Sequence, residues 1–279
     1  EFFASLDAIA AAKRELIQGL AAPASAVLNA DDARVRHFAE GFEGRVLLFG
    51  FSDEAQVRAE NLDDQGCDGA EFDLVAGSHR HRLRLGLIGR HNVENALAAY
   101  ATASLFGIEL DVAGEVFPSL EPPPLRGCRL RFAEGFTLIN DAYNANPRAV
   151  AALAEAVSRT PGAGRRILVL GEMRELGPAG PDLHRETGRR IAALGNIDIL
   201  VGVTGLAAEL VAGAQAAGWP PARALFFESK AAAADWLCQS VCAGDLVLLK
   251  ASRAVALETL LDALHEKFAL EATPAVRAQ

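Results

Sequence analysis

Short apolar runs alternate with amphipathic stretches along the second half of the chain. The runs are rich in Val, Leu and Ile, and each is followed by a stretch with apolar residues at helical spacing. An α/β fold with a parallel sheet covered on both faces produces this alternation, because its strands are buried and its crossovers are helices. The strands are expected at 136–140, 166–171, 197–202, 224–228 and 245–250, and the helices at 147–159, 181–194, 205–217, 229–242 and 253–268.

Polar segments follow the ends of these expected strands. They read NDAYNANP, GEMRELG, GVTG, ESK and KASR. In open α/β sheets, ligands bind beyond the carboxyl ends of the strands. The pattern therefore predicts a ligand site built from these segments at one edge of the sheet.

The first half of the chain is less regular. A helix is expected at about 5–20, strands at SAVLNA and RVLLFG, antiparallel strands within 56–89, and helices at 91–106 and 111–119. The segment EPPPLRG (121–127) then interrupts the pattern, because its prolines prevent a helix and stiffen the chain. We expect a boundary there between two domains, residues 1–122 and 123–279.

Composition narrows the classes of function. The 279 residues are 51% hydrophobic, enough for a sizeable core, and they carry 27 basic against 36 acidic side chains. The resulting formal charge of -9 argues against nucleic-acid binding, which usually shows as a basic excess. The sequence has no apolar run long enough for a membrane span and no secretory signal, so we expect neither a membrane partner nor export.

The cysteines and the first residue indicate the cellular compartment of the protein and whether the chain is a piece of a longer one. The four cysteines form no CxxC pair, which favours small buried thiols in the reducing cytoplasm. The sequence starts at Glu1 rather than Met, and we therefore expect a processed or truncated piece of a longer protein.

Hydrogen-bonding side chains crowd one strand-to-helix turn, LINDAYNANPRAV (138–150). Asn146 followed by Pro147 is typical of a helix start, where Asn caps the first turn and Pro occupies the first helical position. Asp141, just past the strand, can accept hydrogen bonds from ribose hydroxyls, and Tyr143 offers an aromatic face and a hydroxyl group. Turn formation and capping alone are the alternative explanation.

The turn NDAYNANP resembles the signature of the Mur ligases. Further blocks match this family in the same order, namely GRHNVENALAA (89–99), LGEMRELG (170–177) with LHRETG (183–188), and LLKASR (248–253). NDAYNANP and LGEMRELG together resemble the branch that adds D-alanyl-D-alanine to UDP-N-acetylmuramoyl-tripeptide. The resemblance implies that residues 1–122 are the C-terminal part of a central ATPase domain. It also implies that residues 123–279 form a Rossmann-like, doubly wound ligase domain.

One family feature is missing from the sequence. It contains no GxxxxGK[ST] phosphate loop and no Gly-Lys pair. In ATP-using enzymes that loop supplies backbone donors, a Lys and a magnesium-binding hydroxyl group. Relative to the family, the phosphate loop and the N-terminal domain are absent, so we expect the chain alone to be inactive.

The resemblance also implies a nucleotide site. Asn side chains suit adenine because an amide both donates and accepts hydrogen bonds, and an arginine can neutralise phosphate charge. Arg126 and Arg131 lie close to the matching arginine and blur its assignment. The residues implied to bind ATP are His91, Asn92, Asn95, Arg129, Asp141 and Tyr143.

A second set of residues is implied to bind the incoming dipeptide. These are Asn144, Asn146, Lys250, Ser252 and Arg253, of which the last three suit a carboxylate. LLKASR differs from the family's usual Lys-Gly-Ser-Arg by Ala251. Either Glu172 or Glu175 is expected to bind the ammonium group of the dipeptide. His184 is expected to be a capping or surface residue.

Lys13 lies in AIAAAKREL, in a chain with only four Lys residues. A solvent-facing Lys beside Glu15 is the plain interpretation. In Mur ligases, however, the matching lysine reacts with carbon dioxide, and its carbamate helps to hold Mg²⁺, a hard cation that prefers oxygen ligands. Because that reaction needs a neutral amine, partial burial among Ala and Ile would assist it. In this chain alone we expect Lys13 unmodified and no bound metal.

The implied chemistry is ATP-dependent amide-bond formation through an acyl phosphate. The cofactors would be ATP and Mg²⁺, and the partners UDP-N-acetylmuramoyl-tripeptide and D-alanyl-D-alanine. We expect a cytoplasmic monomer that binds no nucleic acid. Two alternatives stay open: another ligase of the superfamily, such as a folylpolyglutamate synthetase or an earlier Mur ligase, and a non-catalytic nucleotide-binding module.

Overall fold

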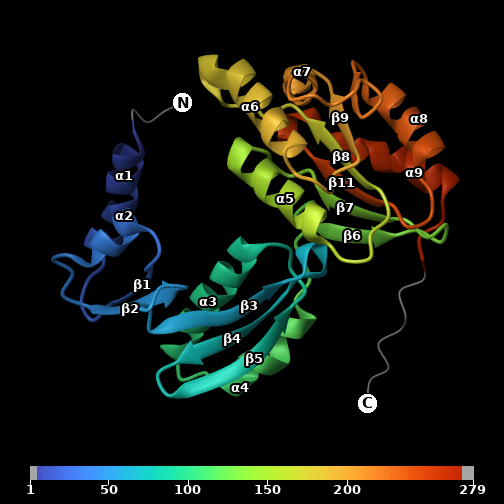
Figure 1. Ribbon diagram of the computed structural model, residues 1–279. Helices are drawn as coiled ribbons and strands as arrows, with labels where there is room; N and C mark the ends of the chain where they lie inside the picture. Colours follow the sequence, from blue (N-terminus) through green and yellow to red (C-terminus); the bar gives the residue numbers. More distant parts are fainter. Residues whose placement is uncertain (1–4, 272–279) are drawn as a thin grey trace. The chain divides into compact units, whose positions relative to one another are not determined.

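The computed structural model describes residues 5–271, and the chain divides into two compact units (Figure 1). The N-terminal unit comprises Glu1–Glu121 and the C-terminal unit Pro122–Gln279. Each unit has its own sheet and its own hydrophobic core. Within residues 5–271, no helix combines the length and the apolar character needed to cross a lipid bilayer.

The C-terminal unit is built on one mixed sheet. Within residues 122–271 its strands follow the order β10-β9-β8-β11-β7-β6. Neighbouring strands are parallel except for β6, which pairs antiparallel with β7 at the edge. The parallel strands lie where the apolar runs predicted them, whereas β6 was not anticipated because CRLR is too short to show a clear alternation. The bounds are β6 Cys128–Arg131, β7 Thr137–Asp141, β8 Arg166–Gly171, β9 Ile199–Val203, β10 Ala224–Phe227 and β11 Leu246–Lys250.

Helices cover both faces of this sheet. From β7 through β8 and β9 to β10 the chain moves in one direction across the sheet, and it then returns to insert β11 between β7 and β8. Since parallel crossovers are right-handed, the reversal places α5, α6 and α7 on one face and α8 on the other (Figure 1). The bounds are α5 Pro147–Arg159, α6 Gly180–Ala192, α7 Ala207–Ala216, α8 Lys230–Ser240 and α9 Leu260–Lys267.

The last helix is shorter than the pattern at 253–268 suggested. Two 3₁₀ turns, Arg253–Val255 and Leu257–Thr259, precede α9 and are separated by Ala256. Ala256 has a φ of 50°, in the left-handed region, so an α-helix cannot run through it. The segment after KASR is therefore a series of turns.

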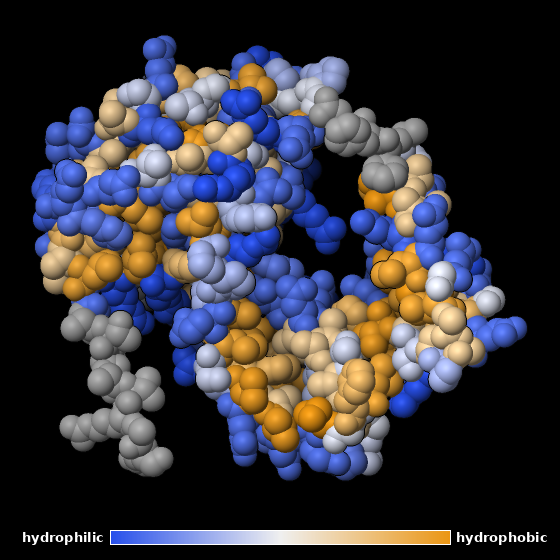
Figure 2. All heavy atoms as spheres, turned by 180° about the vertical axis from the view of Figure 1, so that it is seen from behind, coloured by the Kyte–Doolittle hydropathy of each residue, from blue (hydrophilic) through white to orange (hydrophobic). Residues whose placement is uncertain are grey.

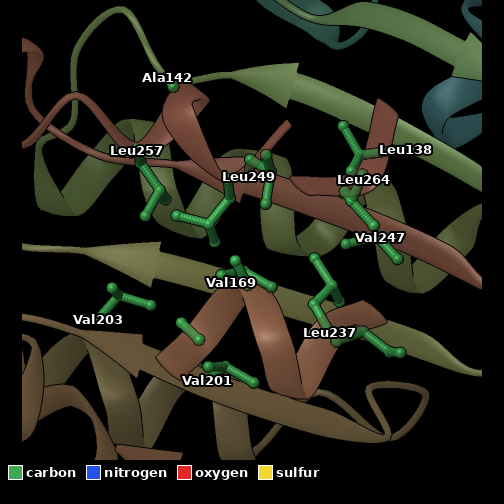
Figure 3. Close-up of a cluster of buried hydrophobic side chains, with 14 of the residues drawn as sticks. Leu138, Ala142, Val169, Val201, Val203, Leu237, Val247, Leu249, Leu257 and Leu264 are labelled. Carbon is green, nitrogen blue, oxygen red and sulfur yellow. The ribbon is translucent and has the colours of Figure 1, made fainter. Parts of the chain in front are cut away.

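Apolar side chains of the central strands pack against α8 and α9. Figure 3 shows Val169, Val201 and Leu249 of the sheet together with Leu237 of α8 and Leu264 of α9. Leu237, Leu249 and Leu264 are each 0% exposed. Burying one such side chain completely contributes about 1.5–3 kcal/mol. The cluster therefore holds β8, β9 and β11 in place, and with them the polar segments at the strand ends.

The N-terminal unit contains a second sheet, in the order β1-β2-β3-β4-β5 among the described residues. β1, β2 and β3 are parallel neighbours, while β3, β4 and β5 pair antiparallel, as the alternation within 56–89 predicted. α3 packs on this sheet and buries Val93, Leu97 and Ala101. The bounds are α1 Leu6–Gln18, β1 Ser25–Asn29, α2 Ala33–Arg36, β2 Arg45–Gly50, β3 Val57–Asp64, β4 Ala70–Ala76, β5 His79–Leu85, α3 Arg90–Ser104 and α4 Leu110–Val116.

Exposed apolar side chains are concentrated on the N-terminal unit, where Figure 2 shows extensive apolar surface. None of the residues of α1 is completely buried, and Leu6 and Leu16 are 66% and 74% exposed. Phe106, shortly before α4, is 82% exposed. Contiguous apolar surface is typical of a contact with another polypeptide segment or a partner.

The cysteines are less uniformly buried than expected. Cys67 is buried, Cys128 and Cys238 are half-buried, and Cys242 is exposed. Cys242 lies in the loop after α8, which ends at Ser240. None of the four cysteines, all of which lie within residues 5–271, forms a disulfide.

Candidate functional site at the carboxyl edge of the C-terminal sheet

The turn between β7 and α5 is closed by a helix cap. The side chain of Asn146 accepts a hydrogen bond from the backbone N–H of Ala149 at 2.9 Å, and Pro147 occupies the first helical turn. This confirms the predicted cap. Asn146 therefore has a structural role, whatever its contact with a substrate.

Tyr143 and Asn144 lie at the exposed tip of this turn. The side chain of Asn144 accepts a hydrogen bond from the backbone N–H of Ala145 at 2.8 Å. The guanidinium group of Arg126 lies over the ring of Tyr143, 3.9 Å from its centre. β6 runs antiparallel to β7, so the residues before and within β6, including the half-buried Arg129, lie beside the end of β7. Arg126 as well as Arg129 is therefore a candidate for the phosphate-neutralising arginine.

Lys250 joins the ends of β11 and β7. The two strands are parallel neighbours, and Lys250 lies opposite Asp141 in their register. Its ammonium group donates to the Asp141 carboxylate and, at 2.8 Å, to the carbonyl oxygen of Asn144. Lys250 is 3% exposed, and a buried cation needs such partners. The charge of Lys250 therefore holds the turn, and its binding of a substrate carboxylate stays a prediction.

Ser252 links three segments that are far apart in the sequence. Its backbone N–H donates to the carbonyl oxygen of Glu172 at 3.2 Å. Its hydroxyl oxygen accepts from the backbone N–H of Arg174 at 2.8 Å, and the hydroxyl donates to the carbonyl oxygen of Ala145 at 3.3 Å. The NDAYNANP, GEMRELG and KASR motifs thus meet at one edge of the sheet, as strand-end positions predicted.

Other charged side chains at this edge are more accessible. Arg253 pairs with Glu258 while its own side chain stays 57% exposed, so it remains a candidate for binding a carboxylate. Glu172 is 18% exposed and pairs with Arg174 at 3.3 Å. Glu175 is exposed and has a φ of 65°. Of the two glutamates, Glu175 is the more accessible to an ammonium group.

His184 is buried on α6, contrary to the expected capping or surface role. Its Nε2 accepts a hydrogen bond from the backbone N–H of Met173 at 2.9 Å, and its Nδ1 lies 2.7 Å from the carbonyl oxygen of Gly180. Burial lowers the pKa of the imidazole below its ordinary value of 6.5. Residues 180, 184, 187, 188 and 191 share one helix face and are all buried, but most of them are Gly, His or Thr, so the sequence shows no apolar stripe at this face.

In the N-terminal unit, the residues predicted to approach adenine lie in the first two turns of α3. Gly89 caps the helix with a φ of 89°, a conformation that Gly adopts readily. The Asn92 amide donates to the carbonyl oxygen of Ile88 at 2.9 Å, and the Asn95 amide donates to the side-chain oxygen of Asn92 at 3.2 Å. His91 and Asn95 are exposed. Adenine binding by these residues stays a prediction.

Lys13 is exposed on α1, so the partial burial that would assist carbamate formation is not found. Ala10 and Ile17 on the same helix are half-buried. Among residues 5–271, no three His, Cys, Asp or Glu side chains come together as a metal site.

Two family models match the chain, and both describe the same family. The Mur ligase middle domain matches residues 1–103, and the glutamate ligase domain of Mur ligases matches residues 126–253. The chain belongs to the Mur ligase family. The two matches contain every sequence block that carried the resemblance, from GRHNVENALAA to LLKASR.

Relatives of this Mur ligase chain point to one branch of the family. The UDP-N-acetylmuramoyl-tripeptide–D-alanyl-D-alanine ligases of Escherichia coli (strain K12) and Bacillus subtilis (strain 168) are 32% and 28% identical to it. The alignments cover 95% and 94% of this chain but 57% and 56% of those enzymes. The chain therefore spans little more than half the length of the relatives it matches.

Solved structures of the same branch share the fold. MurF from Acinetobacter baumannii matches with a TM-score of 0.82 at 26% identity, over 94% of this chain and 56% of that one. MurF ligase from Thermotoga maritima, in complex with ADP, matches with a TM-score of 0.79 at 25% identity, over 96% and 59%. The expected fold class is confirmed: part of a Mur ligase central domain followed by a Rossmann-like, doubly wound sheet.

Proposed function

We propose that this chain is part of an ATP-dependent ligase that joins D-alanyl-D-alanine to UDP-N-acetylmuramoyl-tripeptide in peptidoglycan precursor synthesis. In this proposal residues 1–122 are the C-terminal part of the central ATPase domain, and residues 123–279 are the ligase domain. The relatives from Escherichia coli and Bacillus subtilis carry this activity in their names, and the structural neighbours belong to the same branch.

The observation that carries the proposal is the meeting of three motifs at one sheet edge. Lys250 and Ser252 connect NDAYNANP, GEMRELG and KASR through hydrogen bonds. A dipeptide with free ends needs a cation for its carboxylate and an anion for its ammonium group. The exposed Arg253, the accessible Glu175 and the amides of the turn meet those needs.

The reaction has two steps. The terminal carboxylate of the tripeptide attacks the γ-phosphorus of ATP, which forms an acyl phosphate and releases ADP. The amine of D-alanyl-D-alanine then attacks the acyl carbon, the carbon–oxygen bond to phosphate breaks, and the nitrogen loses a proton as phosphate leaves. Since correct placement of two reactants can contribute about 7–11 kcal/mol, the main task of the ligase-domain residues is to hold the dipeptide amine at the acyl carbon.

The proposed function includes the binding of ATP. The Thermotoga maritima neighbour was solved with ADP, which supports a nucleotide site in this fold. The Asp141 carboxylate, 17% exposed and oriented by Lys250, would accept hydrogen bonds from ribose. The other residues proposed for ATP are His91, Asn92, Asn95, Arg129 and Tyr143.

The test uses the complete gene product that contains this sequence. With ATP, UDP-N-acetylmuramoyl-tripeptide and D-alanyl-D-alanine, we expect UDP-N-acetylmuramoyl-pentapeptide and ADP in equal amounts, by mass spectrometry and a coupled ADP assay. Product formed only with a single amino acid would favour another ligase of the superfamily. Nucleotide binding without any product would favour the binding-module alternative.

The 279-residue chain alone is expected to release no phosphate, because its sequence contains no phosphate loop.

Asp141→Asn in the complete protein is expected to raise the KM for ATP about tenfold, and to raise the KM for D-alanyl-D-alanine less. A hydrogen bond to a charged acceptor contributes about 1.5–3 kcal/mol, and asparagine keeps an acceptor for Lys250 while removing the charge. Steady-state kinetics with each substrate varied in turn measure both constants. An unchanged KM for ATP would leave Asp141 with its structural role in the turn only.

A further inference from the structure

His184 is a buried polar residue that the proposed chemistry does not use. It is 0% exposed, and both ring nitrogens face backbone groups. The N–H of Met173 can only donate, so Nε2 must carry a lone pair, and the carbonyl oxygen of Gly180 can only accept, so Nδ1 must carry a proton. Both hydrogen bonds form together only in the neutral tautomer with its proton on Nδ1.

The loop that His184 contacts, Glu172–Leu176 after β8, has a strained backbone. Glu175 has a φ of 65°, in the left-handed region that residues other than Gly disfavour. Such a conformation persists only where the surroundings impose it. The loop is held from two directions: the N–H of Met173 bonds to His184 on α6, and the N–H of Arg174 bonds to Ser252 after β11.

We propose that His184 is a positioning residue whose neutral imidazole fixes the Glu172–Leu176 loop at the edge of the sheet where the dipeptide binds. The hydrogen-bonded path leads from His184 through the loop to Ser252, and from Ser252 to Ala145 in the turn before α5. The identity of the bound molecule rests on the proposed function, whereas the fixing of the loop does not.

Protonation of His184 is incompatible with this arrangement. A proton on Nε2 would face the N–H of Met173, and the charge would lie in a site without solvent. Burial is the largest influence on the pKa of His184 and lowers it, while the hydrogen bond to Gly180 raises it. The carboxylates that face it also raise its pKa, and each already pairs with an arginine: Glu172 with Arg174 in the loop, and Glu209 of α7 with Arg185 of α6.

The stability that His184 contributes is expected to depend on pH. Because its folded-state pKa is lowered, the contribution is complete above the ordinary value of 6.5 and is lost as the pH falls toward the folded-state value. His184→Gln keeps an amide oxygen that can accept from Met173 and does not titrate. The advantage of wild type over His184→Gln is therefore expected to shrink between about pH 7.5 and about pH 5.5. Urea unfolding followed by tryptophan fluorescence measures the free energy of unfolding of both proteins at each pH. A difference between wild type and His184→Gln that does not change with pH would contradict a buried neutral His184.

NMR on the ¹⁵N-labelled 279-residue chain tests the positioning directly. In wild type we expect a protonated Nδ1, a bare Nε2 and slow hydrogen exchange of the Met173 amide. The shorter side chain of His184→Asn can reach the carbonyl oxygen of Gly180 but not the N–H of Met173, so hydrogen exchange of the Met173 amide should accelerate at least about tenfold. His184→Gln can reach Met173 and should restore most of the protection of this amide from exchange. Thr187→Val is the matched control, because the Thr187 hydroxyl bonds within α6, to the carbonyl oxygen of Leu183.

Three results would overturn the positioning role. The first is a protonated Nε2 in the wild-type chain, a measurement that needs no variant to fold. The second is an unchanged exchange rate of the Met173 amide in His184→Asn, and the third is the same acceleration of that exchange in Thr187→Val.

Kinetics of the complete ligase separate this inference from the proposed function. His184→Asn is expected to raise the KM for D-alanyl-D-alanine about tenfold with little change in the KM for ATP, and His184→Gln to recover most of the loss. If the exchange data agree while the KM for the dipeptide is unchanged, His184 still fixes the loop. The assignment of this edge to the dipeptide would then be the part that fails.

Discussion

Lys250→Met is expected to lower the free energy of unfolding of the C-terminal unit by about 3 kcal/mol and to remove most ligase activity of the complete protein. Lys250 is 3% exposed and is bound to the Asp141 carboxylate and the Asn144 carbonyl oxygen. Methionine fills a similar volume but leaves a largely buried carboxylate and a carbonyl oxygen without their donor. The turn that carries Asp141, Tyr143 and Asn144 then loses its connection to β11.

A double-mutant cycle tests whether the loss of stability comes from breaking the pair of Lys250 and Asp141. Lys250→Met combined with Asp141→Asn removes both charges, so the double variant should be less destabilised than the sum of the single variants by about 1–2 kcal/mol. Lys267→Met is the matched control, because Lys267 is exposed and bonds a single carbonyl oxygen, and it should change stability by less than about 0.5 kcal/mol. Both tryptophans lie in the C-terminal unit, so fluorescence during urea unfolding reports on this unit. Strict additivity in the cycle would show that the pair does not hold the turn.

Lys13→Ala in the complete ligase is expected to reduce turnover at least about 100-fold while leaving the unfolding of the protein unchanged. The resemblance to the Mur ligases implies that Lys13 acts as a carbamate, whose oxygen atoms would stabilise charge at the phosphates through a bound cation. Lys13 is exposed on α1, and Ala is the best helix former, so the substitution has no structural cost. A loss of turnover would therefore report on chemistry.

Two comparisons make the Lys13 experiment specific. Glu15→Ala changes another exposed charged residue of α1 and should retain nearly full turnover. Added bicarbonate should not restore Lys13→Ala, because no amine remains to be carbamylated, whereas a short-chain carboxylate is expected to restore part of the rate. Full activity of Lys13→Ala would end the assignment of a catalytic role to this lysine.

Features that depend on neighbouring residues could be recognised in the sequence. Asn146, Pro147 and the helical spacing after them predicted a helix at 147–159, which are the observed bounds of α5. The parallel strands of the C-terminal unit were found for the same reason, since a fully buried strand reads as a continuous apolar run. The motif NDAYNANP likewise indicated the family because its residues are adjacent.

The individual hydrogen-bond partners between distant segments could not be recognised in the sequence. Lys250 and Asp141 are 109 residues apart, and they meet only because β11 inserts between β7 and β8. No local pattern contains that strand order. The resemblance of LLKASR to the family motif implies a carboxylate-binding Lys250, but the motif does not contain its partner Asp141.

His184 shows how helix packing decides the role of a single residue. The sequence indicates no partner for it, and this favours a capping or surface role. α6 packs so closely on α7 that a side chain at Gly188 would lie 2.0 Å from the carbonyl oxygen of Leu210, and this close contact turns the face with His184 inward.

The sequence by itself determined the order of the elements, the helix cap and the family, because periodicity, capping and motifs act over a few adjacent residues. Only the tertiary structure decided that Lys250 is a buried partner of Asp141, that Ser252 joins three motifs and that His184 holds the loop after β8. Burial and hydrogen-bond partners arise where strands and helices from distant parts of the chain pack together, and packing of that kind has no local signature.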